Sequence, residues 1–170
     1  MSKPSIPILG FAAFSGTGKT TLLKKLIVAL TEKKLRIGII KQSHHDFEID
    51  VPGKDSYELR KAGASQTLIT SPHRWALIQE NQQGIANTLS ENIELLDLEK
   101  LDIILVEGFK QSAFTKIELN RDSLHKPLLY PHDANIIAIA TDNLETQHSI
   151  PVLDMNNTEE IVDFIFQHLL

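Results

Sequence analysis

The segment Ala13-Phe-Ser-Gly-Thr-Gly-Lys-Thr20 constrains the fold of this chain more than any other. Residues 6–13 are apolar at nearly every position, which is typical of a strand buried on both faces of a parallel sheet. Residues 20–33 repeat leucine and isoleucine at helical spacing, with lysine and glutamate elsewhere on the wheel. A buried strand, a glycine-rich turn and an amphipathic helix in this order predict a P-loop, the phosphate-binding turn of many α/β proteins.

The predicted turn has the residues that phosphate binding needs. The P-loop pattern is a glycine, four residues of any kind and then Gly-Lys-Ser/Thr, and only Ala13, at the first glycine, departs from it. Backbone N–H groups of such a loop and the start of the next helix form a concave anion site. We expect Lys19 to reach the β- and γ-phosphates and the Thr20 hydroxyl to hold Mg²⁺. The predicted nucleotide contacts are Ser15, Gly16, Thr17, Gly18, Lys19, Thr20 and Thr21. The alternative is a glycine turn that only joins strand to helix.

A second apolar segment, residues 101–107, ends in a carboxylate at Glu107 and is followed by Gly108. In P-loop proteins an acid at the end of a neighbouring strand lies beside the metal ion. Glu107 is therefore the predicted magnesium partner together with Thr20, and Lys19 and Glu107 are the predicted catalytic groups. The alternative is an acid that caps the turn at Gly108. Asp102, at the start of the segment, is interpreted as a cap.

The rest of the chain alternates strand-like and helix-like segments without a linker that would divide it. Trp75 is expected in the core, and residues 116–119 are expected to form an edge strand. The sequence predicts a three-layer α/β P-loop NTPase fold with a mainly parallel, mixed central sheet, built as one nucleotide-binding domain over residues 1–170. Predicted strands are 36–42, 66–70, 75–79, 103–106, 116–119 and 136–140, and predicted helices are 55–62, 85–96 and 158–169.

Composition narrows the classes of function. The chain has 170 residues, of which 42% are hydrophobic, and it has no cysteine, which excludes disulfides and thiolate metal sites. The net charge of −5 argues against a broad basic surface for nucleic acid. No apolar stretch approaches the roughly 20 residues that span a bilayer. We expect a cytoplasmic protein that binds neither nucleic acid nor membrane.

A loop with two histidines follows the predicted strand 36–42, at the sheet edge where open α/β sheets bind ligands. Three interpretations are open: a transition-metal site at His44 and His45, a solvated loop, or contact with the γ-phosphate, Mg²⁺ or the phosphate of a pterin. The last is preferred because Lys54 and Arg60 add positive charge nearby in sequence. The predicted ligand contacts of this region are Lys41, His45 and Asp46.

Taken together, five segments resemble the B proteins of molybdopterin-guanine dinucleotide biosynthesis nearly from end to end. They are AAFSGTGKTTLL at 12–23, KQSHHD at 41–46, GKDSYELR at 53–60, RWAL at 74–77 and LVEGFK at 105–110. The resemblance implies a homodimer that binds GTP with Mg²⁺ and hydrolyses it slowly, if at all. It also implies an accessory role toward the molybdenum cofactor guanylyltransferase, which joins GMP to molybdopterin, with molybdopterin as a second ligand.

Two departures from related families bear on mechanism. Dimeric P-loop ATPases with a signature lysine would carry it at position 14, where this chain has Phe14. GTPases recognise guanine with Asn/Thr-Lys-x-Asp, whereas residues 139–143 read Ile-Ala-Thr-Asp-Asn and lack the lysine. Asp142 can still accept hydrogen bonds from the N1–H and 2-amino groups of guanine, so it is the predicted base contact. The alternative is an aspartate in a plain turn.

Two other functions fit the same motifs. A small-molecule kinase would use the P-loop and Glu107 equally well, but a kinase lid normally supplies several arginines. The four arginines of this chain are scattered, at Arg36, Arg60, Arg74 and Arg121. A metal-delivery GTPase would use the histidine pair of the 43–46 loop.

Overall fold

The computed structural model describes residues 6–43, 46–81 and 86–170. Contacts within the chain form two compact units: residues 1–42 with 89–170 make up unit 1, and residues 43–88 make up unit 2. The single domain stays a prediction. Within the described ranges no helix is long and apolar enough to cross a membrane.

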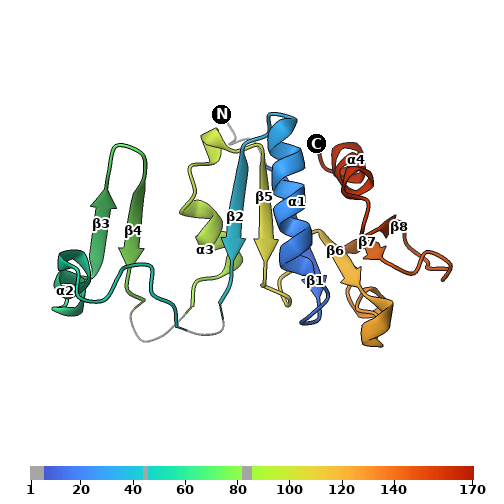
Figure 1. The fold of residues 1–170 in the computed structure, drawn as a ribbon, viewed down its shortest axis with the longest axis horizontal. Helices are drawn as coiled ribbons and strands as arrows, with labels where there is room; N and C mark the ends of the chain where they lie inside the picture. The colour runs from blue at the N-terminus through green and yellow to red at the C-terminus, as the bar shows by residue number, and fades with distance from the viewer. Residues whose placement is uncertain (1–5, 44–45, 82–85) are drawn as a thin grey trace. The chain divides into compact units, whose positions relative to one another are not determined.

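Unit 1 is built on a six-stranded sheet in the order β2-β5-β1-β6-β7-β8, and every neighbouring pair is parallel. The α/β fold with a mainly parallel central sheet is therefore confirmed (Figure 1), whereas the predicted mixture is wrong for this sheet, because the antiparallel pair of the described residues, β3 with β4, forms a separate two-stranded sheet. Its elements are β1 (Ile8–Ala13), α1 (Lys19–Glu32), β2 (Ile37–Lys41), α3 (Leu89–Glu94), β5 (Ile103–Glu107), β6 (Lys116–Asn120), β7 (Ile136–Thr141), β8 (Val152–Asp154) and α4 (Thr158–His168), with short 3-10 turns at Leu98–Lys100, Asp122–Leu124 and Tyr130–His132.

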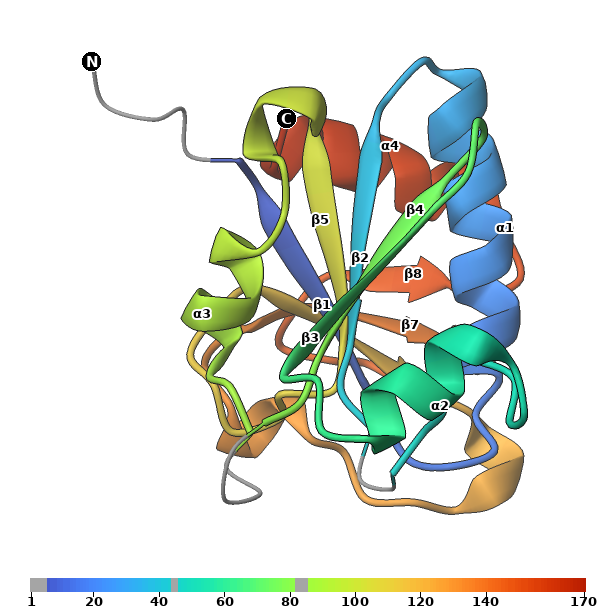
Figure 2. The same cartoon turned by 90° about the vertical axis from the view of Figure 1, so that its left-hand side faces the viewer.

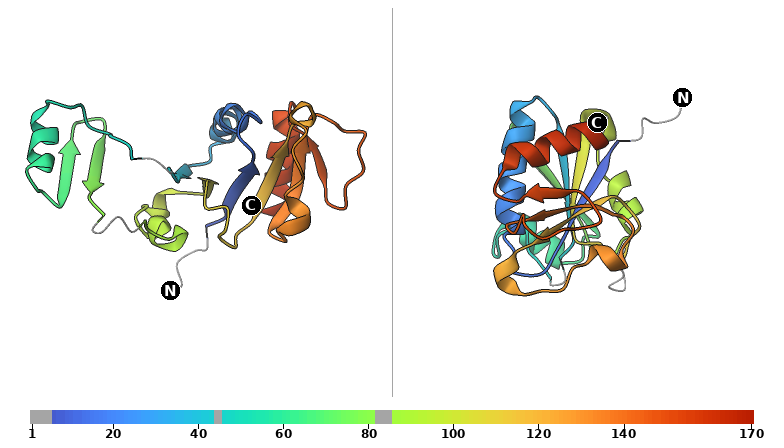
Figure 3. Two further views of the ribbon diagram at one scale, coloured as in Figure 1. Left: turned by 90° about the horizontal axis from the view of Figure 1, so that it is seen from below. Right: turned by 90° about the vertical axis from the view of Figure 1, so that its right-hand side faces the viewer.

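Helices cover both faces of this sheet. Helices α1 and α4 lie on one face and α3 lies on the other (Figures 2 and 3). Strand β5 shows how the sequence builds this arrangement, because successive side chains of a strand point to opposite faces. Ile103 and Leu105 pack with α1 and α4, whereas Ile104 and Val106 pack on the side of α3. A strand covered on both faces has no polar side to show, which explains its uninterrupted apolar sequence.

Strand β6 corrects one prediction, since it lies between β1 and β7 and is not an edge strand. Its polar residues, Lys116 and Glu118, are both buried. The ammonium of Lys116 is 2.8 Å from Oδ2 of Asp133. The carboxylate of Glu118 accepts the backbone N–H groups of residues 129 and 130, each at 2.8 Å. Buried polar groups are tolerated when they are paired in this way, and these partners lie outside the strand.

Two further boundaries differ from the predictions. The helix predicted over 85–96 begins only at Leu89 in α3, and residues 86–88 are not helical, while residue 85 lies outside the described residues. Strand β8, Val152–Asp154, was missed because three residues are too short to show a period.

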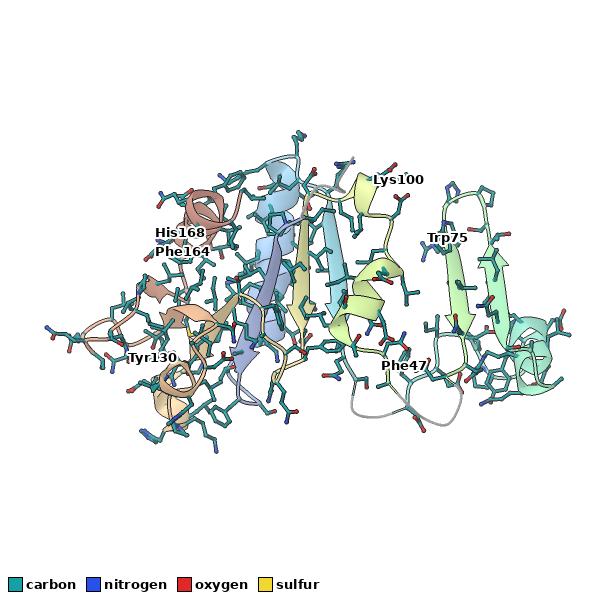
Figure 4. All side chains as sticks on the ribbon, turned by 180° about the vertical axis from the view of Figure 1, so that it is seen from behind. Phe47, Trp75, Lys100, Tyr130, Phe164 and His168 are labelled. Carbon is teal, nitrogen blue, oxygen red and sulfur yellow. The ribbon has the colours of Figure 1, made fainter. Side chains whose placement is uncertain are left out.

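Unit 2 contains α2 (Asp55–Lys61) and a hairpin of β3 (Gln66–Thr70) and β4 (Trp75–Gln79). The strands pair antiparallel with Leu68 opposite Leu77 and Thr70 opposite Trp75, so the bounds of the predicted hairpin are confirmed. The expectation that Trp75 is a core residue is wrong, because its exposed fraction is 69%. Figure 4 shows the Trp75 side chain pointing away from the hairpin backbone.

One buried arginine joins the parts of unit 2. The guanidinium of Arg60, in α2, forms ion pairs with Glu48 on the preceding loop and with Glu80 after β4. The side chain of Arg60 is buried between these two acids. Arg60 therefore ties helix, loop and hairpin together.

Candidate functional site

The turn between β1 and α1 has the backbone geometry of a P-loop. Gly16 and Gly18 have φ of 85° and 92°, a region that glycine adopts at little cost. Ala13 is the last residue of β1 and is buried in the strand, so this first position of the pattern needs no glycine here. The loop therefore has glycine at positions 16 and 18, where its conformation requires glycine. It has alanine at position 13, where the strand conformation does not require glycine.

Helix α1 offers an anion site at its start. It has 14 residues, no side chain caps its first N–H groups, and no acidic residue lies in its first turn. The partial positive charge of a helix N-terminus thus has no counter-charge in this first turn. Ser15, Thr20 and Thr21 are exposed around it, while Thr17 is buried with its hydroxyl donating to the Phe14 carbonyl at 3.0 Å. A ligand can meet Thr17 only through its backbone.

Glu107 lies between two lysines. One carboxylate oxygen is 3.5 Å from the ammonium of Lys19 and the other is 3.5 Å from that of Lys41. Strand β5 brings Glu107 beside Lys41, because the two residues are register partners in the β2–β5 pair. The carboxylate is 18% exposed and Lys19 is 19% exposed, so this ion pair is partly shielded from water, whereas the side chain of Lys41 is 62% exposed. The structure thus brings together three side chains that the sequence predicted separately.

The turn after Glu107 is fixed by a glycine. Gly108 has a φ of 106°, and a Cβ at this position would lie 2.6 Å from Cβ of Gln42. The backbone N–H of Gln42 donates to the backbone carbonyl of Glu107 at 2.8 Å. The side-chain oxygen of Gln42 accepts the backbone N–H of Phe109, also at 2.8 Å. The ends of β2 and β5 are therefore tied together where Lys41 and Glu107 meet.

Asp142 lies just after β7 and already has partners. One carboxylate oxygen accepts the N–H of Asp122 at 2.9 Å, and the other accepts from the guanidinium of Arg121 at 3.1 Å. Arg121 also donates from Nε to the Thr17 carbonyl in the P-loop, at 3.3 Å. Arg121 is 104 residues from Thr17 and belongs to no motif, so no signal in the sequence assigned it to this site. The role of Asp142 toward guanine stays a prediction.

The loop after β2 falls in part outside the described residues. His44 and His45 are among the residues whose structure is not described, and Asp46 is an exposed residue of unit 2. The predicted contacts of His45 and Asp46 with a ligand stay predictions. Across residues 6–43, 46–81 and 86–170, three or more histidine, aspartate or glutamate side chains never gather as a metal ion would need.

Comparison with known proteins bears on the whole chain. A model of the family described as "Molybdopterin guanine dinucleotide synthesis protein B" matches residues 8–142. A protein of Escherichia coli (strain K12) named "Molybdopterin-guanine dinucleotide biosynthesis adapter protein" is 49% identical, over 97% of this chain and 94% of the relative. A protein of the same name from Haemophilus influenzae is 40% identical, over 94% of this chain and 88% of the relative.

Solved structures agree with the fold. The crystal structure of a molybdopterin-guanine biosynthesis protein B is similar with a TM-score of 0.74 at 26% identity, covering 95% of this chain and 99% of the other. The crystal structure of Bacillus subtilis MobB has a TM-score of 0.73 at 27% identity. The match covers 97% of this chain and 99% of the other.

Proposed function

The chain belongs to the family of molybdopterin guanine dinucleotide synthesis protein B, and from that premise we propose that it is a GTP-binding adaptor that assists the attachment of GMP to molybdopterin. The relatives carry the adapter role in their names. The observation that carries the nucleotide part of the proposal is the P-loop with Glu107 held between Lys19 and Lys41. Two lysines beside a helix start without a side-chain cap suit the triphosphate of a nucleotide.

Mg²⁺ fits the residues present. The Thr20 hydroxyl in the first turn of α1 and the Glu107 carboxylate at the end of β5 are hard oxygen donors, which Mg²⁺ prefers. A bound Mg²⁺ would neutralise charge on the phosphate oxygens. Glu107 now interacts with Lys19 and Lys41, so these lysines must turn toward the phosphates when Glu107 turns toward the metal. The nucleotide and the metal would then bind together.

Hydrolysis by the protein alone should be slow. Position 14 carries phenylalanine, so the P-loop offers no lysine to a neighbouring molecule. Arg121, although near the loop, is engaged by Asp142 and the Thr17 carbonyl. With Lys19 and Glu107 as the groups at the phosphates, we expect turnover far below the usual enzyme range of about 1 to 10³ per second. The site then serves regulation.

Protein partners are part of the proposal. We assign to this chain a homodimer and a molybdenum cofactor guanylyltransferase as partner, with molybdopterin as a second ligand and the cytoplasm as its location. Leu68, Trp75 and Leu77 share one face of the unit 2 hairpin and are exposed, which supports a protein contact there. Exposed apolar patches of this kind are typical of interaction surfaces.

Calorimetric titration with GTP and Mg²⁺ tests the nucleotide site. Lys19→Ala should abolish binding without lowering thermal stability, because it removes a charge at the phosphates and no core volume. Lys24→Ala is the matched control, since Lys24 is an exposed lysine one turn further along the same helix. Wild-type affinity in Lys19→Ala would exclude the proposed phosphate site.

Assisted product formation tests the adaptor. With limiting molybdenum cofactor, the protein should raise the yield of guanine dinucleotide made by the guanylyltransferase, and Lys41→Ala should reduce that gain. Lys33→Ala is the control, because Lys33 is the C-cap of α1, at the end opposite the P-loop, and pairs with Glu159 of α4. The adaptor proposal fails if the yield does not change when the protein is removed. It fails equally if the protein transfers the γ-phosphate to a small acceptor at ordinary kinase rates.

A further inference from the structure

Arg121 lies against the P-loop although it comes from another part of unit 1. It follows β6 directly, and its Nε donates to the carbonyl of Thr17 at 3.3 Å. A Cβ added to Gly18 would lie 3.5 Å from Nη2 of Arg121. The guanidinium therefore touches the turn that forms the predicted phosphate site.

A second contact fixes the other edge of the same guanidinium. Nη1 donates to one carboxylate oxygen of Asp142 at 3.1 Å, and Asp142 is itself held by the N–H of Asp122 at 2.9 Å. The N–H groups of a guanidinium all lie in its plane. Bonds to Thr17 and Asp142 therefore hold the group by its edges and leave its flat faces without hydrogen-bonding partners. The side chain is 34% exposed, so a ligand can reach it.

A pocket opens beside this anchored group. It has a volume of about 410 Å³ and is lined by Asp122, Ser123, Asp142, Asn143, Leu144 and Glu145. Arg121 does not itself line the pocket, but its guanidinium hydrogen-bonds to Asp142, which does. Its volume falls in the range of about 300–1,000 Å³ that is typical of small-molecule pockets. The exposed side chain of Leu144 adds an apolar contact.

We propose that this pocket receives the nucleoside of a bound nucleotide and that the purine base stacks on the guanidinium of Arg121. Guanidinium planes stack well on aromatic rings and on bases. The P-loop would hold the phosphates while Arg121, which touches the same loop at Thr17, would hold the base. This inference rests on the proposed function, because it requires a nucleotide at the P-loop.

Arg121 and Asp142 would have different roles, one in the affinity for nucleotides and the other in the selectivity for guanine. Stacking tolerates any base, since every base has a flat π face. Arg121 would thus contribute to the binding of GTP and ATP alike. A carboxylate has about four acceptor positions, and two of those on Asp142 are engaged by Arg121 and Asp122. The remaining positions can accept from the N1–H and 2-amino groups of guanine, so selectivity would belong to Asp142.

Three ligands test the inference in calorimetric titrations of the full chain with Mg²⁺: GTP, ATP and inorganic tripolyphosphate. Arg121→Ala should weaken GTP and ATP binding by about 5- to 150-fold, the range for removal of a base-stacking platform. Tripolyphosphate has no base, so its affinity should change less than about twofold. Arg121→Lys keeps the charge and loses the plane, and it should behave more like the alanine variant than like the wild type.

Arg36→Ala is the matched control, because Arg36 also pairs with an aspartate, Asp102, at the opposite end of β5 from Glu107. It should leave all three affinities unchanged. An equal loss for tripolyphosphate in Arg121→Ala would show that Arg121 only supports the P-loop and would overturn the inference, as would unchanged nucleotide affinity. If the wild type binds none of the three ligands, the proposed function fails, and the inference fails with it.

Discussion

Unit 1 and unit 2 use strands of similar length in opposite ways. In unit 1, strand residues such as Leu9, Ile104 and Ile117 are fully buried between helices on both faces of the sheet. In unit 2, Leu68 and Trp75 of the hairpin are 60% and 69% exposed. Unit 1 therefore buries its own core, whereas the hairpin of unit 2 has a hydrogen-bonded ladder and an apolar face open to solvent. A two-stranded hairpin is marginally stable by itself. The difference indicates that the buried core lies mainly in unit 1, and it supports the proposal that unit 2 offers a contact surface.

The largest expected effect is on the core of unit 1. Leu26→Ala, in α1, should lower the free energy of unfolding by about 2–5 kcal/mol, because it opens a cavity where the side chain is fully buried. The same change at Leu68, in β3, should cost less than about 0.5 kcal/mol. Urea unfolding of both variants at micromolar protein gives the comparison. Equal losses in the free energy of unfolding would mean that the hairpin face is covered in solution. The proposed difference between the two units would then be wrong.

The next effect concerns a buried acid of unit 1. Glu118→Gln should lower the free energy of unfolding by about 1–3 kcal/mol, because an amide accepts only through its oxygen and turns its NH₂ toward one of the N–H groups that Glu118 now accepts. Glu159→Gln, at the exposed start of α4, is the control. A Glu118→Gln variant as stable as the control would make the buried carboxylate dispensable for the position of β6.

The same residue predicts a pH dependence. Burial raises the pKa of Glu118 above its ordinary value of 4.5, against the lowering effect of the two N–H groups. A raised pKa in the folded state means that the stabilising contribution is complete below 4.5 and declines as the pH rises through the folded pKa. Glu118→Gln should lack this decline. The difference in urea midpoint between wild type and variant, measured from pH 4 to 7, should thus shrink as the pH rises, and a growing difference would contradict it.

Trp75 gives a spectroscopic test of unit 2. It is the single tryptophan of the chain and lies exposed on β4. At low protein concentration its emission should be that of a solvated indole and acrylamide should quench it readily. Formation of a homodimer through this face should shift the emission to the blue as concentration rises. A blue-shifted emission maximum already at nanomolar protein would mean that Trp75 is covered in the monomer. An emission maximum that does not change with concentration would mean that the dimer forms through another surface.

The smallest expected effect is at the surface of unit 1. The guanidinium of Arg36 lowers the pKa of Asp102 to about 2 through two side-chain hydrogen bonds. This stabilisation is present above the ordinary value of 3.8 and is lost as the pH falls through about 2. Asp102→Asn should therefore lower the thermal midpoint slightly at pH 7 and by less at pH 2. Both side chains are partly exposed, so the effect should be below that of Glu118→Gln. A larger shift in the thermal midpoint would mean that the Arg36–Asp102 pair contributes as much to stability as the buried groups do.

Local signals explain what could be predicted from the sequence. The P-loop, the helix after it and the hairpin of residues 66–79 each depend on neighbours in the sequence, and the structure has them as predicted. Strand β6 was misplaced because Asp133, the partner of Lys116, lies 17 residues away. Arg121 was missed because its partner at Thr17 is 104 residues away. Trp75 was misjudged because a large apolar side chain does not reveal which face of a hairpin remains open.

The ion pairs of Glu107 have a consequence for how the site would fill. Two lysines and one carboxylate make a cluster in which the chain itself already neutralises one of the two positive charges. An anion that binds to Lys19 and Lys41 must therefore displace an internal counter-ion, and the carboxylate that is displaced then needs a cation. Under the proposed function, an anion would replace Glu107 on the lysines and a metal ion would replace the lysines on Glu107. Such an exchange would favour a metal–triphosphate complex, which supplies both charges at once, over an anion without a metal.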